Sequence, residues 1–206
     1  VYSDRTPMHE QSKAEPVTAY GKSKLLAEQY LAEIKDLPLV VLRPTAVYGP
    51  REKDIFIVLK TLNLGLEPYI STKPQWLSFV YVKDLARAVI QALGAGMHHA
   101  SYNLSDGNSY DRYALATITK RILGKKAIRF HLPMGVVNVM ARLLEAAYAA
   151  SSKMPVLNKE KLNELAAENW NCSIDRIRQD LGFVPEYDLE KGLAHTLKWY
   201  KENNWL

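Results

Sequence analysis

The spacing of apolar residues near the start of the chain predicts a helix followed by a buried strand. Residues 18–34 carry leucine and isoleucine at helical intervals, after Pro16 and with Thr18 in a position to cap the helix. Residues 39–42 (LVVL) are continuously apolar, as is typical of a strand buried on both faces. Helix, short loop and buried strand together predict a piece of a parallel α/β sheet, which needs another strand before the helix.

Beyond residue 50 the pattern becomes mixed. We expect helices over 55–64, 84–93, 110–123, 135–150, 159–169, 174–181 and 189–203, and short strands over 77–82, 102–104 and 127–132. The change in pattern predicts two parts: residues 1–50, with the remnant of a doubly wound parallel sheet, and residues 51–206, a smaller mixed α/β domain. The predicted fold class is α/β.

The composition is that of an ordinary globular protein. Of the 206 residues, 48% are hydrophobic and 24% are charged, and a chain of this size buries enough surface to fold without a metal or a disulfide. Cys172 is the single cysteine, so no internal disulfide can form, which suits a reducing compartment. Disordered and disulfide-scaffold classes are therefore excluded.

Charge and hydropathy argue against several partners. The net charge of +5 is modest for a nucleic-acid-binding protein. The longest apolar stretch, residues 134–150, is interrupted by polar residues and is shorter than the ~20 residues of a membrane span. His98 and His99 are adjacent and so do not face one ligand on a helix. We expect no nucleic acid, no membrane span and no metal.

Three Tyr-x-x-x-Lys pairs occur, namely Tyr20/Lys24, Tyr69/Lys73 and Tyr187/Lys191. On a helix this spacing places both side chains on one face, where the ammonium favours the phenolate and the phenol can exchange a proton with a substrate oxygen. Only Tyr20/Lys24 lies on a helix that leads into a buried strand. Because ligands collect at the carboxyl ends of parallel strands, the residues after that strand, Arg43–Thr45, are expected beside the pair.

These residues resemble the extended short-chain dehydrogenase/reductases of the NAD-dependent epimerase/dehydratase type. The resemblance rests on ordered motifs along the whole chain: Val1-Tyr2-Ser3, AYGKSK at 19–24, RPTAVYGPR at 43–51, FVYVKDLA at 79–86, LGFVP at 181–185 and Trp199-Tyr200. It implies a Rossmann-type sheet, NAD or NADP as cofactor and a cytoplasmic location, and it is compatible with a homodimer.

The resemblance also implies roles for particular residues. Tyr20 would be the catalytic acid/base, and Lys24 would bind the nicotinamide ribose and lower the pKa of the tyrosine, so that both residues are expected among the catalytic and the cofactor-binding residues. Pro44, Thr45 and Val47 would border the nicotinamide. The family's Gly-rich phosphate loop and its catalytic Ser or Thr would lie before Val1, so the 206 residues alone are expected to be inactive.

The substrate expectation depends on one departure from the family. Nucleotide-sugar members often carry an arginine at the position of Leu77, whereas residues 130–133 and 155–158 look more like members that act on sterol-like or flavonoid-like alcohols and ketones. Arg51 and Tyr81 point to the substrate by analogy. We predict hydride transfer with an apolar secondary alcohol or ketone. The alternatives are a nucleotide-sugar epimerase/dehydratase and a cofactor-sensing protein without turnover.

Overall fold

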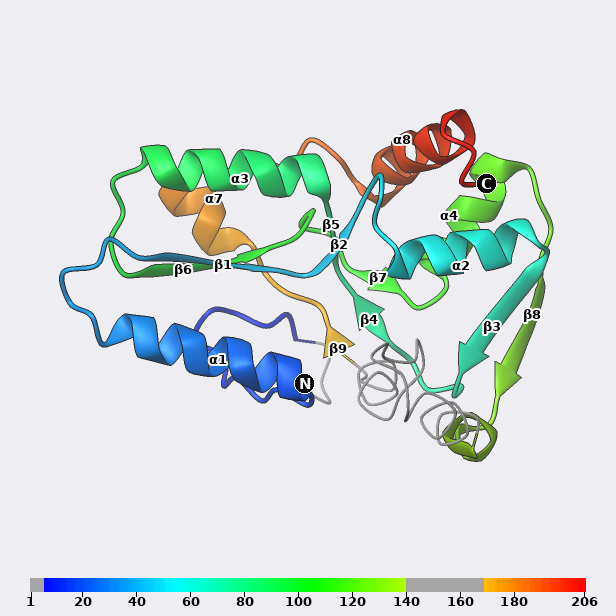
Figure 1. Ribbon diagram of the computed structural model, residues 1–206, viewed down its shortest axis with the longest axis horizontal. Helices are drawn as coiled ribbons and strands as arrows, with labels where there is room; N and C mark the ends of the chain where they lie inside the picture. Colours follow the sequence, from blue (N-terminus) through cyan, green and yellow to red (C-terminus); the bar gives the residue numbers. More distant parts are fainter. Residues whose placement is uncertain (1–5, 140–168) are drawn as a thin grey trace, which may run out of the picture.

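A parallel strand pair with helices on both faces forms one side of the molecule. The computed structural model describes residues 6–139 and 169–206. Strand β1 (Val40–Pro44) pairs with β6 (Ala100–Leu104) in parallel, from Val40 opposite Ala100 to Pro44 opposite Leu104. Helix α1 (Ala19–Ala32) lies below this pair in Figure 1, and α3 (Val82–Gly94) and α7 (Asp175–Leu181) lie above it. The layering confirms the predicted α/β class.

The core of this layer combines distant parts of the chain. Its buried residues come from β5 (Phe79–Tyr81), α3, β6 and the segment around α7: Val80, Ala88, Ala100, Tyr102, Leu104, Ile174, Ile177 and Phe183. The strand pairing therefore crosses the boundary predicted near residue 50, because β6 completes the sheet of β1. The division into residues 1–50 and 51–206 stays a prediction; α3, β6 and α7, which it assigns to the second part, pack with β1 in the structure.

Short strands and helices, among them α2, α4 and α8, form the other side of the described structure (Figure 1). Strand β2 (Ala46–Tyr48) pairs in parallel with β5 (Phe79–Tyr81), and β3 (Leu66–Ile70) with β8 (Ile128–Leu132). The third sheet has the order β7 (Tyr110–Asp111), β4 (Trp76–Leu77), β9 (Asn169–Trp170). Helices α2 (Asp54–Asn63), α4 (Ala114–Leu123) and α8 (Leu189–Glu202) pack around a core of Tyr48, Leu59, Phe79, Tyr81, Leu189, Leu193, Leu197 and Tyr200.

Most predicted elements are confirmed, with local corrections. The predicted strand 77–82 is two strands, β4 and β5, and Val82 already belongs to α3. The predicted helix 110–123 begins only at Ala114, because residues 110 and 111 form β7. Residues 134–139 are helical. The rest of the predicted helix 135–150, and all of 159–169 except Asn169 in β9, lie outside the described residues.

Strand β3 had no signal in the sequence. Pro68 lies at its centre, opposite Phe130 of β8, and proline lacks the N–H that an inner strand needs. Within the described ranges β3 pairs with β8 alone. The N–H that Pro68 lacks is therefore not needed for a hydrogen bond to a second neighbouring strand. Among the described helices, none is both long enough and apolar enough to cross a membrane.

Helix α8 approaches β2 too closely for any side chain at Gly192. A Cβ atom there would overlap the hydroxyl oxygen of Tyr48 and lie 2.6 Å from its Cζ, while that hydroxyl donates a 3.1 Å hydrogen bond to the carbonyl of Asp188. We expect Gly192→Ala to lower the free energy of unfolding by about 1–3 kcal/mol or more, since an added methyl group must displace a packed ring. Urea titration followed by circular dichroism measures the change.

Gly94→Ala is the matched control. Gly94 ends helix α3, and no atom lies within 4 Å of a Cβ built there. This substitution should change the free energy of unfolding by less than about 1 kcal/mol, with stabilisation the expected sign. Equal effects at the two positions would contradict the close approach of α8 to Tyr48.

Candidate active site

The start of α1 presents the predicted tyrosine–lysine pair on one open face. The Thr18 hydroxyl accepts a 3.0 Å hydrogen bond from the Gly21 amide and caps the helix. Tyr20, in the first turn, is 68% exposed. The Lys24 ammonium lies 5.4 Å from the centre of its ring, within cation–π range. Both polar groups are thus accessible to a ligand, and the structure brings them together as predicted.

The predicted cofactor contacts at 44–47 lie where β1 passes into β2. Leu104 of β6 holds this junction, because its carbonyl accepts hydrogen bonds from the amide (3.0 Å) and the hydroxyl (3.2 Å) of Thr45. Pro44 is exposed and Val47 is half-buried against the core of the β1–β6 layer. The junction is therefore fixed at the carboxyl end of β1, the edge at which ligands bind in parallel sheets.

An ion pair joins α1 to β1. Arg43, the residue before Pro44, donates from Nε (3.0 Å) and from its terminal nitrogen (2.6 Å) to one carboxylate oxygen of Glu28. Its second terminal nitrogen donates to the carbonyl of Glu10 at 3.3 Å. Sequence reasoning missed this pair, although Glu28 lies four residues after Lys24. The contact fixes the helix of Tyr20 and Lys24 relative to the strand that ends beside Thr45.

The segment before α1 is tied to the same sheet edge. The Glu10 carboxylate accepts a 2.8 Å hydrogen bond from the amide of Asn103 in β6, and the Asn103 side chain donates to the carbonyl of Met8 at 3.1 Å. Met8 also forms a parallel bridge with Cys172. Residues 8–10 thus run across the ends of the strands and connect them to the segment before α7.

Tyr81, predicted to reach the substrate, lies inside the core. It is fully buried, it stands opposite Tyr48, and its hydroxyl lies 2.6 Å from Nδ1 of His195 on α8. Burial, with smaller contributions from Tyr187 and Asp84, raises the pKa of Tyr81 to about 12, so its hydroxyl keeps its proton at neutral pH. The described contacts of Tyr81 are those of a packing residue, and its contact with substrate stays a prediction.

Arg51 is likewise separated from Tyr20. It adopts the left-handed backbone conformation (φ 72°) and its guanidinium lies 5.9 Å from the ring centre of Trp199 on α8. In Figure 1, α8 and α1 lie at opposite corners of the molecule. The structure thus brings Tyr20 together with Lys24, and Pro44 with Thr45 and Val47, while it places Arg51 and Tyr81 against α8.

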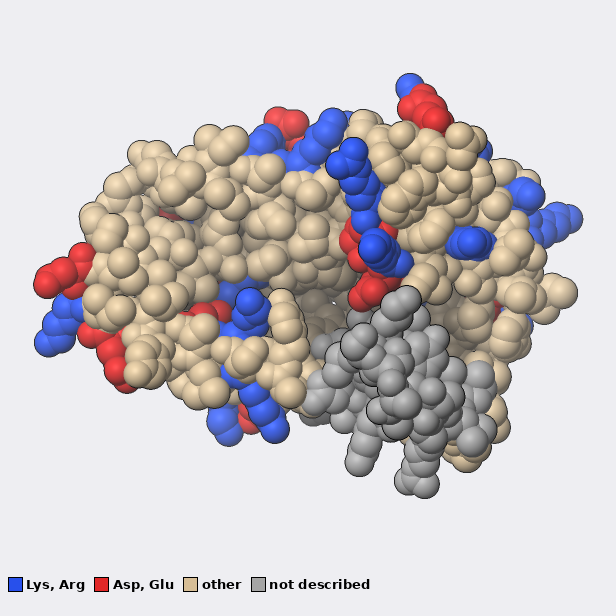
Figure 2. All heavy atoms as spheres, in the orientation of Figure 1, with Lys and Arg blue, Asp and Glu red and all other residues tan. Residues whose placement is uncertain are grey.

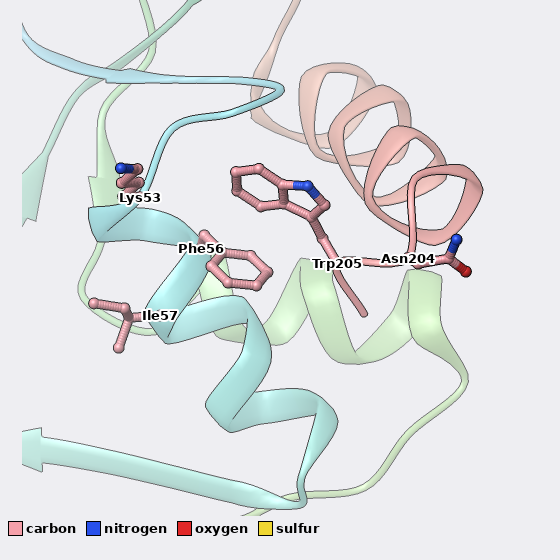
Figure 3. Close-up of a pocket in the computed structure, with 5 residues that line it drawn as sticks. All are labelled: Lys53, Phe56, Ile57, Asn204 and Trp205. Carbon is pink, nitrogen blue, oxygen red and sulfur yellow. The ribbon is translucent and has the colours of Figure 1, made fainter.

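A surface pocket near α8 contains none of the predicted site residues. Figure 3 shows its lining by Lys53, Phe56, Ile57, Asn204 and Trp205. The Phe56 and Trp205 rings pack edge to face at 5.0 Å, and Trp205 stacks on Tyr200 at 5.3 Å. These contacts hold the residues after α8 against α2. The rings that line the pocket therefore have a packing role.

The comparison with protein-family models decides the family, and a comparison with solved structures bears on the fold. The model of the NAD dependent epimerase/dehydratase family matches residues 1–105, half of the chain. The chain belongs to this family. The solved structure of a dTDP-glucose 4,6-dehydratase from Streptomyces venezuelae with NAD bound superposes with a TM-score of 0.74 at 20% identity, over 98% of this chain and 57% of that one. It confirms the Rossmann-type fold.

Curated relatives cover a wide range of sugar substrates by name. A dTDP-glucose 4,6-dehydratase from Escherichia coli is 27% identical over 94% of this chain and 51% of its own length. An N-acetyl-alpha-D-glucosaminyl-diphospho-ditrans,octacis-undecaprenol 4-epimerase, also from Escherichia coli, is 25% identical over 90% of this chain and 57% of its own length. The epimerase-family chain thus spans about half the length of the curated relatives it matches.

The exposed groups fit one end of NAD. The ribose of the nicotinamide carries a diol that needs donors such as the Tyr20 hydroxyl and the Lys24 ammonium, and the flat ring suits an apolar border such as Pro44 and Val47. The pyrophosphate end needs a Gly-rich loop, and residues 1–206 contain no G-x-x-G-x-x-G. Within the described ranges, no three His, Cys, Asp or Glu side chains are arranged to hold a metal ion.

We predict that the Arg43–Glu28 pair contributes measurably to stability. Its side chains are 37% and 25% exposed, so the pair is screened less than a surface pair, and Glu28→Gln should lower the free energy of unfolding by about 1–2 kcal/mol. In hydrogen-exchange mass spectrometry, α1 should exchange faster. Lys198→Gln, which breaks an exposed pair with Glu202 (73% and 58% exposed), is the control and should cost less than about 0.5 kcal/mol. Unchanged exchange in α1 after Glu28→Gln would show that the pair does not hold the helix.

Proposed function

We propose that this chain is part of an NAD(P)-dependent enzyme that transfers hydride between the nicotinamide and a secondary alcohol or ketone, as an oxidoreductase or an epimerase. One observation carries the proposal: Tyr20 and Lys24 lie exposed on one face of α1, and an ion pair fixes this helix to the strand that ends beside Thr45.

Each residue has a defined task in this reaction. As a phenolate, Tyr20 accepts the proton of the substrate alcohol, and as a phenol it gives that proton to the ketone oxygen in the reverse direction; the Lys24 ammonium stabilises the phenolate form. Lys24 also donates to the ribose hydroxyls, while Pro44, Thr45 and Val47 border the ring. When bound, the nicotinamide accepts or delivers the hydride. Residues outside this chain would hold the pyrophosphate and select NAD or NADP.

A sensor without turnover is the alternative from another functional class. Such a protein needs the ribose contact of Lys24 but has no use for an exposed phenol beside it, so Tyr20 favours the enzyme. Three further expectations remain predictions from the resemblance: the 206 residues alone are inactive, the protein is compatible with a homodimer, and its location is cytoplasmic.

Substitution of Tyr20 separates the two functions. In the complete enzyme of which this chain is proposed to be part (the longer protein), Tyr20→Phe should lower kcat by at least ~100-fold, the usual scale for lost acid/base help. Cofactor affinity should change little, because the Lys24 ammonium still donates to the ribose. Lys24→Met should reduce both kcat and cofactor affinity. Steady-state kinetics and calorimetry with NADH and NADPH measure these effects.

Tyr30→Phe is the matched control, because Tyr30 is 76% exposed on the same helix. It should leave kcat and affinity unchanged. Near-wild-type turnover of Tyr20→Phe would refute the acid/base assignment, and cofactor binding without any turnover in the wild type would favour the sensor.

For the substrate, Leu77 favours an apolar alcohol or ketone. It is half-buried in β4 and packs on the core of Tyr48, Phe79 and Tyr81. A diphosphate at this strand would need charged donors, which arginine supplies as a planar fork and leucine lacks. Both relatives described above act, by name, on diphospho-linked sugars, and one of these is carried on a polyprenol. A nucleotide-sugar is therefore the second candidate.

A thermal-shift panel with the cofactor present distinguishes the two substrate classes. We expect saturable stabilisation of the longer protein by sterol, flavonoid or polyprenoid ketones at micromolar concentration, and none by UDP- or dTDP-sugars. Leu77→Arg should weaken the apolar ligands, because it places a charge against the core. Stabilisation by a nucleotide-sugar alone would establish the epimerase/dehydratase alternative.

A further inference from the structure

Arg112 is a buried cation bound to a loop of the chain. It follows β7 and is 8% exposed. Its guanidinium donates to the carbonyl of Ile70 at 2.7 Å and, by a second short hydrogen bond, to the carbonyl of Lys73. Within the described ranges it forms no ion pair with a carboxylate. An arginine buried in this way is costly unless its hydrogen bonds are made, so both carbonyls are structurally important to it.

The loop that Arg112 holds connects β3 with β4. Residues 71–75 turn sharply here, with Ser71 in the left-handed region (φ 65°) and its hydroxyl oxygen accepting a hydrogen bond from the Lys73 amide at 3.3 Å. At the far end, Trp76 stands opposite Asp111, and Leu77 opposite Tyr110. Arg112 is thus the first residue after β7, next to this pairing, and it continues the contact from the ladder into the loop.

Aromatic rings fix the guanidinium itself. Its carbon lies 5.3 Å from the ring centre of Tyr69 in β3 and 5.8 Å from that of Tyr113 at the start of α4. The two rings pack edge to face at 4.9 Å. Arg112 therefore has little freedom to swing away, and the direction of its donors is set by strands β3 and β7 and by α4.

We propose that Arg112 is a positioning residue for substrate binding, which fixes the β3–β4 loop and thereby the strand that carries Leu77. This inference rests on the proposed function, in which Leu77 borders the substrate. Arg112 itself takes no part in proton or hydride transfer. Its loss should weaken substrate binding through a mobile loop, while Tyr20 and Lys24, on α1, keep their geometry.

Hydrogen exchange tests the loop contact without any enzymatic assay. In the 206-residue chain, Arg112→Met should raise the exchange rates of the amides in residues 71–75 by about 10-fold or more, because two loop carbonyls lose their donors. Arg112→Lys, which can reach one carbonyl, should give an intermediate rate and covers the case that the methionine variant does not fold.

Arg129→Met is the control for packing. The Arg129 guanidinium lies 4.1 Å from the ring centre of the same Tyr113 and donates a hydrogen bond to Glu67; within the described ranges it makes no hydrogen bond to the carbonyls of Ile70 and Lys73. It should leave exchange in residues 71–75 unchanged. Equal rates in the wild type and in Arg112→Met would overturn the proposed contact.

Kinetics test the functional part in the longer protein, with cholestanone and dTDP-glucose as representatives of the two substrate classes. For the compound that is turned over, Arg112→Met should raise KM by about 10-fold and lower kcat by less than about 3-fold, and millimolar guanidinium should partly restore KM in Arg112→Ala. Faster loop exchange with an unchanged KM would refute a role in substrate binding. Failure of the Tyr20 prediction, or turnover of neither compound, would refute the proposed function while the exchange result still decides the loop contact.

Discussion

The ion pair between Arg43 and Glu28 is the contact on which the candidate active site depends. Within the described residues, helix α1 has no buried residue, and Arg43 ties it to β1 through hydrogen bonds to Glu28. Charge-assisted hydrogen bonds of this kind are strong and geometrically specific. Because Arg43 directly precedes Pro44, the same residue connects the helix of the proposed proton-transfer pair with the edge of the proposed nicotinamide site.

Local signals in the sequence were sufficient for α1, β1 and the tyrosine–lysine pair. The Thr18 cap, the leucine spacing and the apolar run at 39–42 each act over a few residues, and a helix fixes the relation of Tyr20 to Lys24 by itself.

Charged residues of both signs are spread over the face shown in Figure 2. The net charge of +5 does not indicate how they are placed, so composition alone could not have located the site.

Contacts between distant residues explain what the sequence did not reveal. Strand β3 pairs with β8 some sixty residues later, and Leu66 stands opposite Ile128; its central proline argues against a strand when read locally. The boundary near residue 50 was drawn from a change of pattern, whereas β1 needs β6 to form a sheet. Arg112 falls within the predicted helix 110–123, and the sequence gives no sign of its role. Its partners are the backbone carbonyls of Ile70 and Lys73, and a backbone carbonyl is present at every position whatever the side chain.

The contacts that position the proposed proton-transfer pair differ from the contacts that position Leu77. Arg43 fixes the helix of Tyr20 and Lys24 to β1, while β4, with Leu77, is held by the ladder to β7 and by the loop that Arg112 binds. In the proposed function, a substitution in β4 or its loop therefore changes the strand that borders the substrate without moving the proposed proton-transfer pair. A shared fold does not fix the substrate, which depends on the residues of the site. The proposal accordingly makes Leu77, rather than Tyr20, the residue at which substrate preference in this chain is to be sought.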